Sequence, residues 1–224
     1  MARLTPKLDI LPAAQRLLWP ELSIVPSQFT LYGGTALALR IGHRESADFD
    51  FFSNESFDPD RLASALPFLD GAERVQVAAN TLTCRVERGG PVLLSFFGAL
   101  RLGQVREPDV AADISLNIAS LMDIAGTKVA VVQKRAEAKD YADIAALLDN
   151  GIDLATALAA GHVVYGSTFN PLITLKALSY FADLPDLLPA IQEQLADAVK
   201  ATDPNRLPEL AAYRPRPNDT DVGS

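Results

Sequence analysis

Cysteine is almost absent from this chain: Cys84 is the only one among 224 residues. A single thiol excludes an internal disulfide, and the two histidines and one cysteine do not have the spacing of a structural zinc site. Cys84 lies in the alternating stretch TLTCRVE, which predicts a half-buried thiol on a β-strand.

Long apolar runs are also missing. No run reaches the roughly 20 residues that a membrane-spanning helix needs. The first residues, MARLTPKLDILPAAQ, lack the basic start and the continuous apolar core of a signal peptide. Together with the single cysteine, these features predict a cytoplasmic protein that does not engage a membrane.

Positive charge is scarce, with 20 Lys and Arg against 28 Asp and Glu and a net charge of −8. A chain with this balance has no overall basic field that would attract nucleic acid. Any contact with RNA is therefore expected to depend on a local basic patch.

The pattern of apolar residues changes near residue 118. Before it, short strand-like runs alternate with short helices, and Gly89-Gly90 marks a hairpin between TLTCRVE and PVLLSFF. After it, the segments have helical spacing, as in Tyr141, Ile144, Ala145 and Leu148 at i, i+3, i+4 and i+7. The sequence thus predicts an α/β (α+β) fold: a mixed core over residues 1–118, a helical domain over 119–212, and a polar, disordered tail over 213–224.

The string DFDFF combines two carboxylates with three phenylalanines. Because residues i and i+2 of a strand point to the same face, Asp48 and Asp50 project side by side, about 7 Å apart at Cα. Phe49 and Phe51 then point to the opposite face, where they can be buried. One face of this strand is predicted to be core and the other a carboxylate platform that can hold divalent ions.

A glycine pair precedes an apolar helix a few residues earlier. Gly33 and Gly34 lie between the strand FTLY and the helix TALALRIG, so backbone N–H groups and the positive helix end face an incoming anion. Thr35 adds a hydroxyl at the same turn. A phosphate cradle beside a carboxylate pair is the arrangement needed to handle a nucleoside triphosphate.

A second polar group lies in the stretch GTKVAVVQKRAEAKDYADIAALL. If residues 121–140 formed one helix, Lys128, Arg135 and Lys139 would share a face at i, i+7 and i+11 and could meet phosphates. The alternative is a solvated basic stripe. Asp140 and Asp143 are predicted to cap or brace this region, and His43 is an alternative candidate for a catalytic base.

The stretch GGTALALRIGHRESADFDFF resembles the first motif of the DNA polymerase β-like nucleotidyltransferases, and most closely the AbiEii family of nucleotidyltransferase toxins. The residues that match this first motif are Gly33, Gly34, Thr35, Arg44, Ser46, Asp48 and Asp50. Those that match the family's later motif are Lys128, Arg135, Lys139, Asp140 and Asp143. The resemblance covers roughly residues 28–150.

The resemblance implies a mixed sheet with flanking helices, followed by a helical bundle. It implies a metal-dependent nucleotidyltransferase, of EC class 2.7.7, that uses Mg²⁺ or Mn²⁺ and a nucleoside triphosphate. The acceptor would be tRNA or a protein, and a cognate antitoxin would be a partner. Asp48 and Asp50 would bind metal and act in catalysis with Lys128. The nucleotide would be bound by seven other matched residues: Gly33, Gly34, Thr35, Arg44, Ser46, Arg135 and Lys139.

One departure from the superfamily pattern concerns its third acidic residue. The expected strand, PVLLSFFG, has Ser95 at its centre and no carboxylate from Pro91 to Gly103, so Ser95 takes the third-acid position and Glu87 is the nearest substitute. Two hypotheses follow. The first is an active nucleotidyltransferase toxin, and the second is a catalytically impaired nucleotide-binding or partner-binding module on the same fold.

Overall fold

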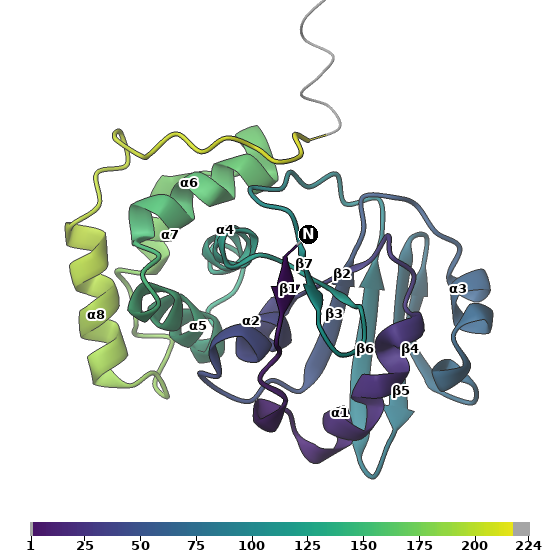
Figure 1. Ribbon diagram of the computed structural model, residues 1–224. Helices are drawn as coiled ribbons and strands as arrows, with labels where there is room; N and C mark the ends of the chain where they lie inside the picture. Colours follow the sequence, from purple (N-terminus) through teal and green to yellow (C-terminus); the bar gives the residue numbers. More distant parts are fainter. Residues whose placement is uncertain (1, 217–224) are drawn as a thin grey trace, which may run out of the picture. The chain divides into compact units, whose positions relative to one another are not determined.

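The computed structural model describes residues 2–216. These residues divide into two compact units, each with its own core (Figure 1). The sheet unit consists of Met1–Arg101 with Pro108–Ala119, and the helical unit consists of Leu102–Glu107 with Ser120–Ser224. The chain therefore enters the helical unit twice, first for six residues and then for the remainder.

The described part of the sheet unit contains one mixed sheet of eight strands, in the order β1-β7-β8-β2-β3-β6-β5-β4. The five strands with clear sequence patterns lie next to one another: β2 (Thr30–Tyr32), β3 (Asp48–Phe52), β4 (Glu73–Ala78), β5 (Thr81–Glu87) and β6 (Pro91–Phe97). The strands β1 (Arg3–Leu4), β7 (Asp109–Ala111) and β8 (Asn117–Ile118) extend the sheet beyond β2. β3 runs antiparallel to β2 and parallel to β6, so it lies between them.

Short helices connect these strands. They are α1 (Ala13–Leu18), α2 (Gly33–Ile41) and α3 (Pro59–Ala65), with 3₁₀ turns η1 (Leu8–Ile10), η2 (Trp19–Ile24) and η3 (Pro67–Leu69). Asp58 caps α3 as predicted, accepting a hydrogen bond from the Arg61 N–H at 2.8 Å. Gly42 ends α2 in the left-handed conformation at φ 73°, a position that favours glycine.

One face of the sheet carries the aromatic core of this unit. Phe49, Phe51 and Phe96 are fully buried, and the rings of Phe51 and Phe96 stack at 4.9 Å between centroids. Cys84 is only 1% exposed on the same face, so it is fully buried and not half-buried as the sequence predicted. The alternating pattern predicted the strand correctly, but it did not show how completely the inner face of the strand is buried.

The helical unit contains α4 (Leu121–Val131), α5 (Ala138–Asp149), α6 (Leu154–Tyr165), α7 (Pro171–Ala177) and α8 (Pro189–Lys200), with the 3₁₀ turn η4 (Gly166–Thr168). In Figure 1, α4 is seen end-on among them. It crosses α6 closely at Gly126, where a Cβ atom would stand 2.8 Å from the main chain of Ala160. Only glycine permits this approach.

Residues 121–140 do not form the single helix that the shared-face argument required. α4 ends at Val131, a turn covers residues 132–134, and α5 begins at Ala138 with Glu137 in extended conformation as its N-cap. Asp140 therefore lies inside α5 and not at its N-cap position. The argument that three cations share one helix face is wrong, because the chain changes direction between Lys128 and Lys139.

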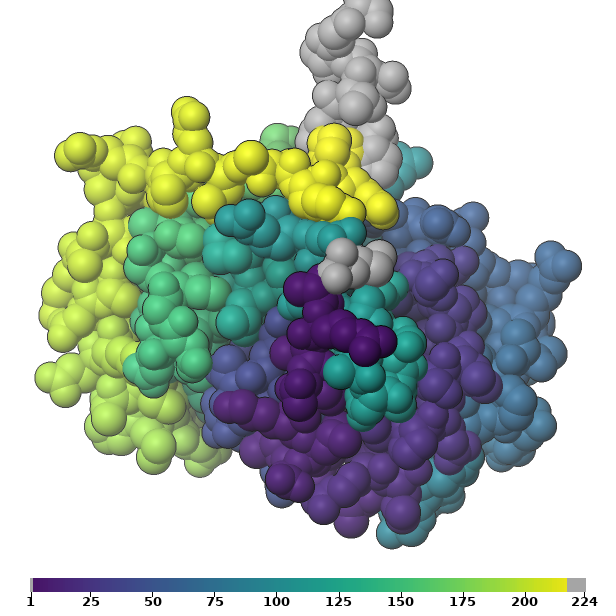
Figure 2. Space-filling view, in the orientation of Figure 1, coloured from purple at the N-terminus to yellow at the C-terminus, as the bar shows by residue number. Residues whose placement is uncertain are grey.

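The C-terminal residues cross the outside of the helical unit as a strap, shown in yellow in Figure 2. The main chains of Gln104 and Arg214 form an antiparallel bridge, and Arg216 Nη1 donates to the Tyr165 carbonyl at 2.6 Å. Residues 213–216 of the predicted tail are thus ordered by hydrogen bonds, and residues 217–224 lie outside the described part of the chain.

Within residues 2–216, no single helix is long and apolar enough to cross a membrane. The bent pair Ala138–Asp149 and Leu154–Thr168, which meets at 115°, passes the same test by length and composition only.

Candidate functional site

The two carboxylates of β3 lie on the face opposite the aromatic core. Burial alternates along the strand: Asp48 and Asp50 are half-buried, and Phe49 and Phe51 are inaccessible to solvent. The i, i+2 spacing therefore places both carboxylates on one side of the sheet, as the alternation predicted.

The glycine pair brings α2 against the same face. Gly33 has a φ of +74°, and a Cβ atom there would stand 2.6 Å from Asp50 Oδ2. A Cβ atom at Gly34 would stand 2.8 Å from both Arg44 Nη2 and Ser46 Oγ. Side chains at either position would occupy the space of these polar groups. The structure thus brings together Gly33, Gly34, Arg44, Ser46 and Asp50 at the N-terminus of α2.

This helix end has the electrostatics of an anion site. The first N–H groups of a helix have no partner within the helix, and the helix dipole places partial positive charge there. Arg44 adds a full positive charge and Ser46 a hydroxyl beside Gly34. A phosphate group could be bound here by main-chain and side-chain donors together.

Thr35 is used differently from the prediction. Its side chain is buried, and its hydroxyl donates to the main-chain carbonyl of Asp48, with the Ser46 carbonyl also within 3.3 Å. The hydroxyl therefore does not face an incoming phosphate. It instead fixes the first turn of α2 to the start of β3, which sets the position of the carboxylates relative to the helix end.

Ser95, which the sequence offered for the third-acid position, lies beside Asp50. It pairs directly with Asp50 in the parallel register of β3 and β6, so the two side chains lie on the same face. Ser95 is 6% exposed and accepts a hydrogen bond from the Thr83 hydroxyl at 3.2 Å. Thr83 was not among the predicted site residues, and a two-residue turn at Gly89-Gly90 would have paired it with Phe96; the observed loop of residues 88–90 pairs it with Ser95.

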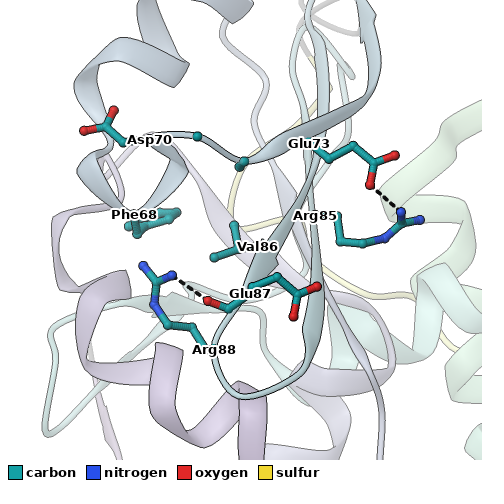
Figure 3. A pocket seen from close by; sticks show the side chains of 9 residues that line it. Phe68, Asp70, Glu73, Arg85, Val86, Glu87 and Arg88 are labelled. Atoms are coloured by element: carbon teal, nitrogen blue, oxygen red, sulfur yellow. Dashed lines mark hydrogen bonds and ion pairs between the residues drawn. The ribbon is translucent and has the colours of Figure 1, made fainter.

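Glu87, the substitute third acid, lies elsewhere. It pairs with Pro91 at the far end of β5, four residues from Thr83, which is about 13 Å along a strand. Figure 3 shows it on the rim of a separate hollow of about 380 Å³, lined also by Phe68, Arg85 and Arg88. In this hollow Arg85 pairs with Glu73, and Arg88 pairs with Glu21 at 2.6 Å, so both guanidinium groups already have carboxylate partners.

The donor atoms at the β3 face suit a hard divalent ion. Asp48 and Asp50 offer carboxylate oxygens, which Mg²⁺ and Mn²⁺ prefer. Within residues 2–216, no group of three or more His, Cys, Asp or Glu side chains is placed to hold a metal ion. Two carboxylates fit an ion that takes its other ligands from substrate phosphates and water.

The cations of the later motif lie in the helical unit. Lys128 is 5% exposed, and its Nζ lies 3.0 Å from Asp140 Oδ1 and 2.6 Å from Asp143 Oδ2, both on buried side chains. It is thus neither a solvated stripe residue nor an exposed phosphate ligand. The predicted bracing role of Asp140 and Asp143 is confirmed, because they join α5 to α4 through the Lys128 ammonium group.

The other two cations are half exposed. The Arg135 side chain is 47% exposed and its Nε lies 2.8 Å from Asp140 Oδ2, so one carboxylate joins Arg135 to Lys128. Lys139 is 50% exposed and pairs with Glu137 at 2.9 Å. The two outer cations could therefore contact phosphate, while Lys128 holds the carboxylate that orients Arg135.

The candidate base His43 is half-buried in the loop between α2 and β3. His162, in α6, packs edge-on against Phe169 at 5.3 Å between ring centroids.

Comparison with known proteins gives a family and a fold. The family model described as nucleotidyl transferase AbiEii toxin, type IV toxin–antitoxin system, matches residues 16–214. An uncharacterized protein of Aquifex aeolicus (strain VF5) is 31% identical over 160 residues, which are 70% of this chain and 75% of that protein.

Two solved structures are similar. MenT4, a nucleotidyltransferase toxin of Mycobacterium tuberculosis H37Rv, has a TM-score of 0.55 and 15% identity, covering 84% of this chain and 80% of its own. An antigenic nucleotidyltransferase-like protein of Paracoccidioides brasiliensis has a TM-score of 0.49 and 20% identity, covering 78% of this chain and 84% of its own. The likeness to MenT4 shows a shared fold.

Proposed function

Because the chain belongs to the AbiEii nucleotidyltransferase toxin family, we propose that it transfers a nucleotide from a nucleoside triphosphate to an acceptor hydroxyl. The acceptor oxygen forms a bond to the α-phosphorus, pyrophosphate leaves, and the hydroxyl proton passes to a base or to solvent. The acceptor is an RNA such as tRNA, or a protein, and the setting is the cytoplasm, with a cognate antitoxin as the counterpart.

One observation carries this proposal: Asp50, Arg44 and Ser46 converge on the glycine N-terminus of α2. A phosphate chain is bound by hydrogen-bond donors and positive charge, whereas a divalent metal ion is bound by carboxylate oxygens. Here both kinds of group lie side by side. Gly34, Arg44 and Ser46 would bind the phosphate chain through N–H, guanidinium and hydroxyl donors.

Asp48 and Asp50 would hold the divalent ion, Mg²⁺ or Mn²⁺, that accompanies the triphosphate. When bound, such an ion neutralises charge that builds up on the transferred phosphate and the leaving pyrophosphate. Thr35 acts indirectly, because its hydrogen bond to the Asp48 carbonyl fixes the strand that carries both carboxylates.

In the helical unit, Arg135 and Lys139 are proposed to contact phosphate, either of the nucleotide or of an RNA acceptor. Lys128 is proposed to contribute through the Asp140 carboxylate that it shares with Arg135. This role differs from the direct catalytic role that the family resemblance implies, because the ammonium group is buried between two carboxylates.

A transfer screen tests the proposal. The purified chain is incubated with Mg²⁺ or Mn²⁺, total RNA or a cell extract, and each of the four α-³²P-labelled triphosphates in turn. We expect one triphosphate to label an acceptor, and nuclease or protease treatment of the product identifies RNA or protein. The matched control is Asp48→Asn/Asp50→Asn, which removes both charges with little change in shape.

The second candidate function is a binding module that retains the nucleotide site without transfer. It is favoured by the presence of Ser95, and not a carboxylate, opposite Asp50. Folded protein that labels nothing with any triphosphate, yet gains thermal stability when a triphosphate and Mg²⁺ are added, would establish the binding module and overturn the transferase.

A further inference from the structure

A row of polar side chains crosses four adjacent strands at the candidate site. Tyr32 pairs with Asp50, Asp50 with Ser95, and Ser95 with Thr83, on β2, β3, β6 and β5 respectively. Paired residues of neighbouring strands project to the same face. The row therefore places Asp50 between the glycine turn on one side and two hydroxyl groups on the other.

The two hydroxyl groups are buried and bonded to each other. Thr83 and Ser95 are each 6% exposed, and Thr83 Oγ1 lies 3.2 Å from Ser95 Oγ. A buried hydroxyl pair in the middle of a sheet carries a desolvation cost, and a hydrophobic pair such as Val and Ala would fill the same volume without it. Their position beside the carboxylates gives a reason for their polarity.

The direction of this hydrogen-bond chain follows from its neighbour. A hydroxyl both donates and accepts, whereas an ionised carboxylate only accepts. When the Thr83 proton is donated to Ser95, the Ser95 proton is left to be donated, and Asp50 lies at the paired position about 4.8 Å away at Cα. If Thr83 donates to Ser95 and Ser95 donates to Asp50, the chain of hydrogen bonds ends at a carboxylate, which can only accept.

We propose that Thr83 is a positioning residue of this site: it holds Ser95 as a hydrogen-bond donor directed at the carboxylate of Asp50. The glycine turn limits the carboxylate on the β2 side, where Oδ2 faces Gly33, and the hydroxyl pair orients it from the β6 side. The inference rests on the proposed function, because it takes Asp50 as a ligand of the ion that accompanies the triphosphate. Ser95 thus supports a metal-binding carboxylate and does not itself replace the third acid.

The test measures metal binding in the presence of a triphosphate chain, without any transfer reaction. Mn²⁺ is titrated into the full chain, alone and with inorganic tripolyphosphate, which carries the phosphate chemistry common to all nucleoside triphosphates. Partners that orient metal ligands typically contribute about 10- to 100-fold in affinity. We expect Thr83→Val and Ser95→Ala each to weaken Mn²⁺ binding with tripolyphosphate by about 10-fold, and Thr83→Ser to restore it.

The double variant Thr83→Val/Ser95→Ala should lose no more than either single variant, because the two hydroxyl groups act in series. Thr81→Val is the matched control: it lies on the same strand and face, opposite Phe97, and makes the same exchange of hydroxyl for methyl. It should bind Mn²⁺ like the wild type. Thermal unfolding of each metal-free variant shows whether the protein remains folded.

Two results would overturn the proposal. One is Mn²⁺ affinity in folded Thr83→Val and Ser95→Ala that stays within about 2-fold of the wild type, well below the loss expected for a partner that orients a ligand. The other is an equal loss in Thr81→Val, which would show a packing effect. If Thr83→Val does not fold, Ser95→Ala decides alone. The failure of the proposed function gives a different result, in which the transfer screen is negative while the Mn²⁺ titrations still separate the variants.

Discussion

The carboxylate of Asp50 lies directly against the main chain of Gly33, so that a Cβ atom at Gly33 would stand 2.6 Å from Asp50 Oδ2. The first residue of a helix and the middle residue of a strand are thereby fixed to each other across the candidate site. A side chain added at Gly33 would therefore have to displace the Asp50 carboxylate.

Gly33→Ala should therefore impair both stability and function. The methyl group meets a carboxylate, and the φ of +74° costs an L-residue roughly 1–2 kcal/mol. Gly34→Ala meets the ends of Arg44 and Ser46, which can move, so it should fold normally and bind triphosphate more weakly. Chemical unfolding and calorimetry with each triphosphate separate the two effects, and unchanged triphosphate affinity in folded Gly34→Ala would contradict the phosphate cradle.

Asp48→Ala and Asp50→Ala should each abolish nucleotide transfer while the protein remains folded. Both side chains are half-buried on a polar face, and removing one of two neighbouring negative charges relieves their repulsion in metal-free protein. We expect the free energy of unfolding to change by less than about 1 kcal/mol. Full transfer activity of both variants at limiting Mg²⁺ would show that the carboxylates do not hold the ion.

Lys128→Met should destabilise the helical unit strongly, by about 3–5 kcal/mol, because it leaves two buried carboxylates without their ammonium partner. Lys139→Met is the matched control, since it removes the same charge from a half-exposed position and should change stability by less than about 1 kcal/mol. Urea unfolding measures both. If Lys128→Met were as stable as the wild type but bound triphosphate poorly, Lys128 would act directly on phosphate.

Ser95→Asp should convert the site into one with three carboxylates. The added charge lies opposite Asp50, so metal-free protein should lose thermal stability through repulsion. Mn²⁺ should bind more tightly than in the wild type, with and without nucleotide, and restore the melting temperature. Equal Mn²⁺ affinity in wild type and variant would mean that position 95 does not reach the ion.

Cys84 should resist alkylation in the folded protein. Burial raises the pKa of its thiol, so at any pH below the raised value the fraction of reactive thiolate is smaller than in the unfolded chain. Labelling by iodoacetamide at pH 8 should be at least about 10-fold slower in native protein than in denaturant, and should accelerate as the pH rises. Equal rates in both states would show that the sheet opens readily around β5.

The elements predicted correctly from the sequence are those specified by local residues. Period-two alternation gave β3 and its two faces, the glycine pair gave the start of α2, and Asp58 gave the start of α3. The hairpin glycines gave the turn between β5 and β6, but not the register that places Thr83 opposite Ser95. The strands β1, β7 and β8 were missed because two or three residues are too few to show a period.

Two predicted site residues have side-chain partners that the sequence did not reveal, because those partners come from distant segments. In the sequence, Lys128 resembles a surface cation. In the structure, α5 places two carboxylates against it, from residues 12 and 15 positions later in the chain. In the sequence, Thr35 resembles a phosphate ligand. In the structure, its hydroxyl donates to the main-chain carbonyl of Asp48 at the start of β3. In both cases the residue type indicated a polar interaction, but the tertiary structure determined the partner.

The chain enters the helical unit twice, and this limits how the protein can be divided into separate fragments. Asp123, 1% exposed in α4, accepts hydrogen bonds from the N–H groups of Val105 at 2.7 Å and Arg106 at 3.2 Å. Those donors belong to Leu102–Glu107, which precedes strands β7 and β8 of the sheet. A fragment that begins at residue 120 would lack both donors, so the buried Asp123 carboxylate would lose two of its hydrogen bonds. A helical fragment therefore needs residues 102–107 in addition to the chain from residue 120 onward.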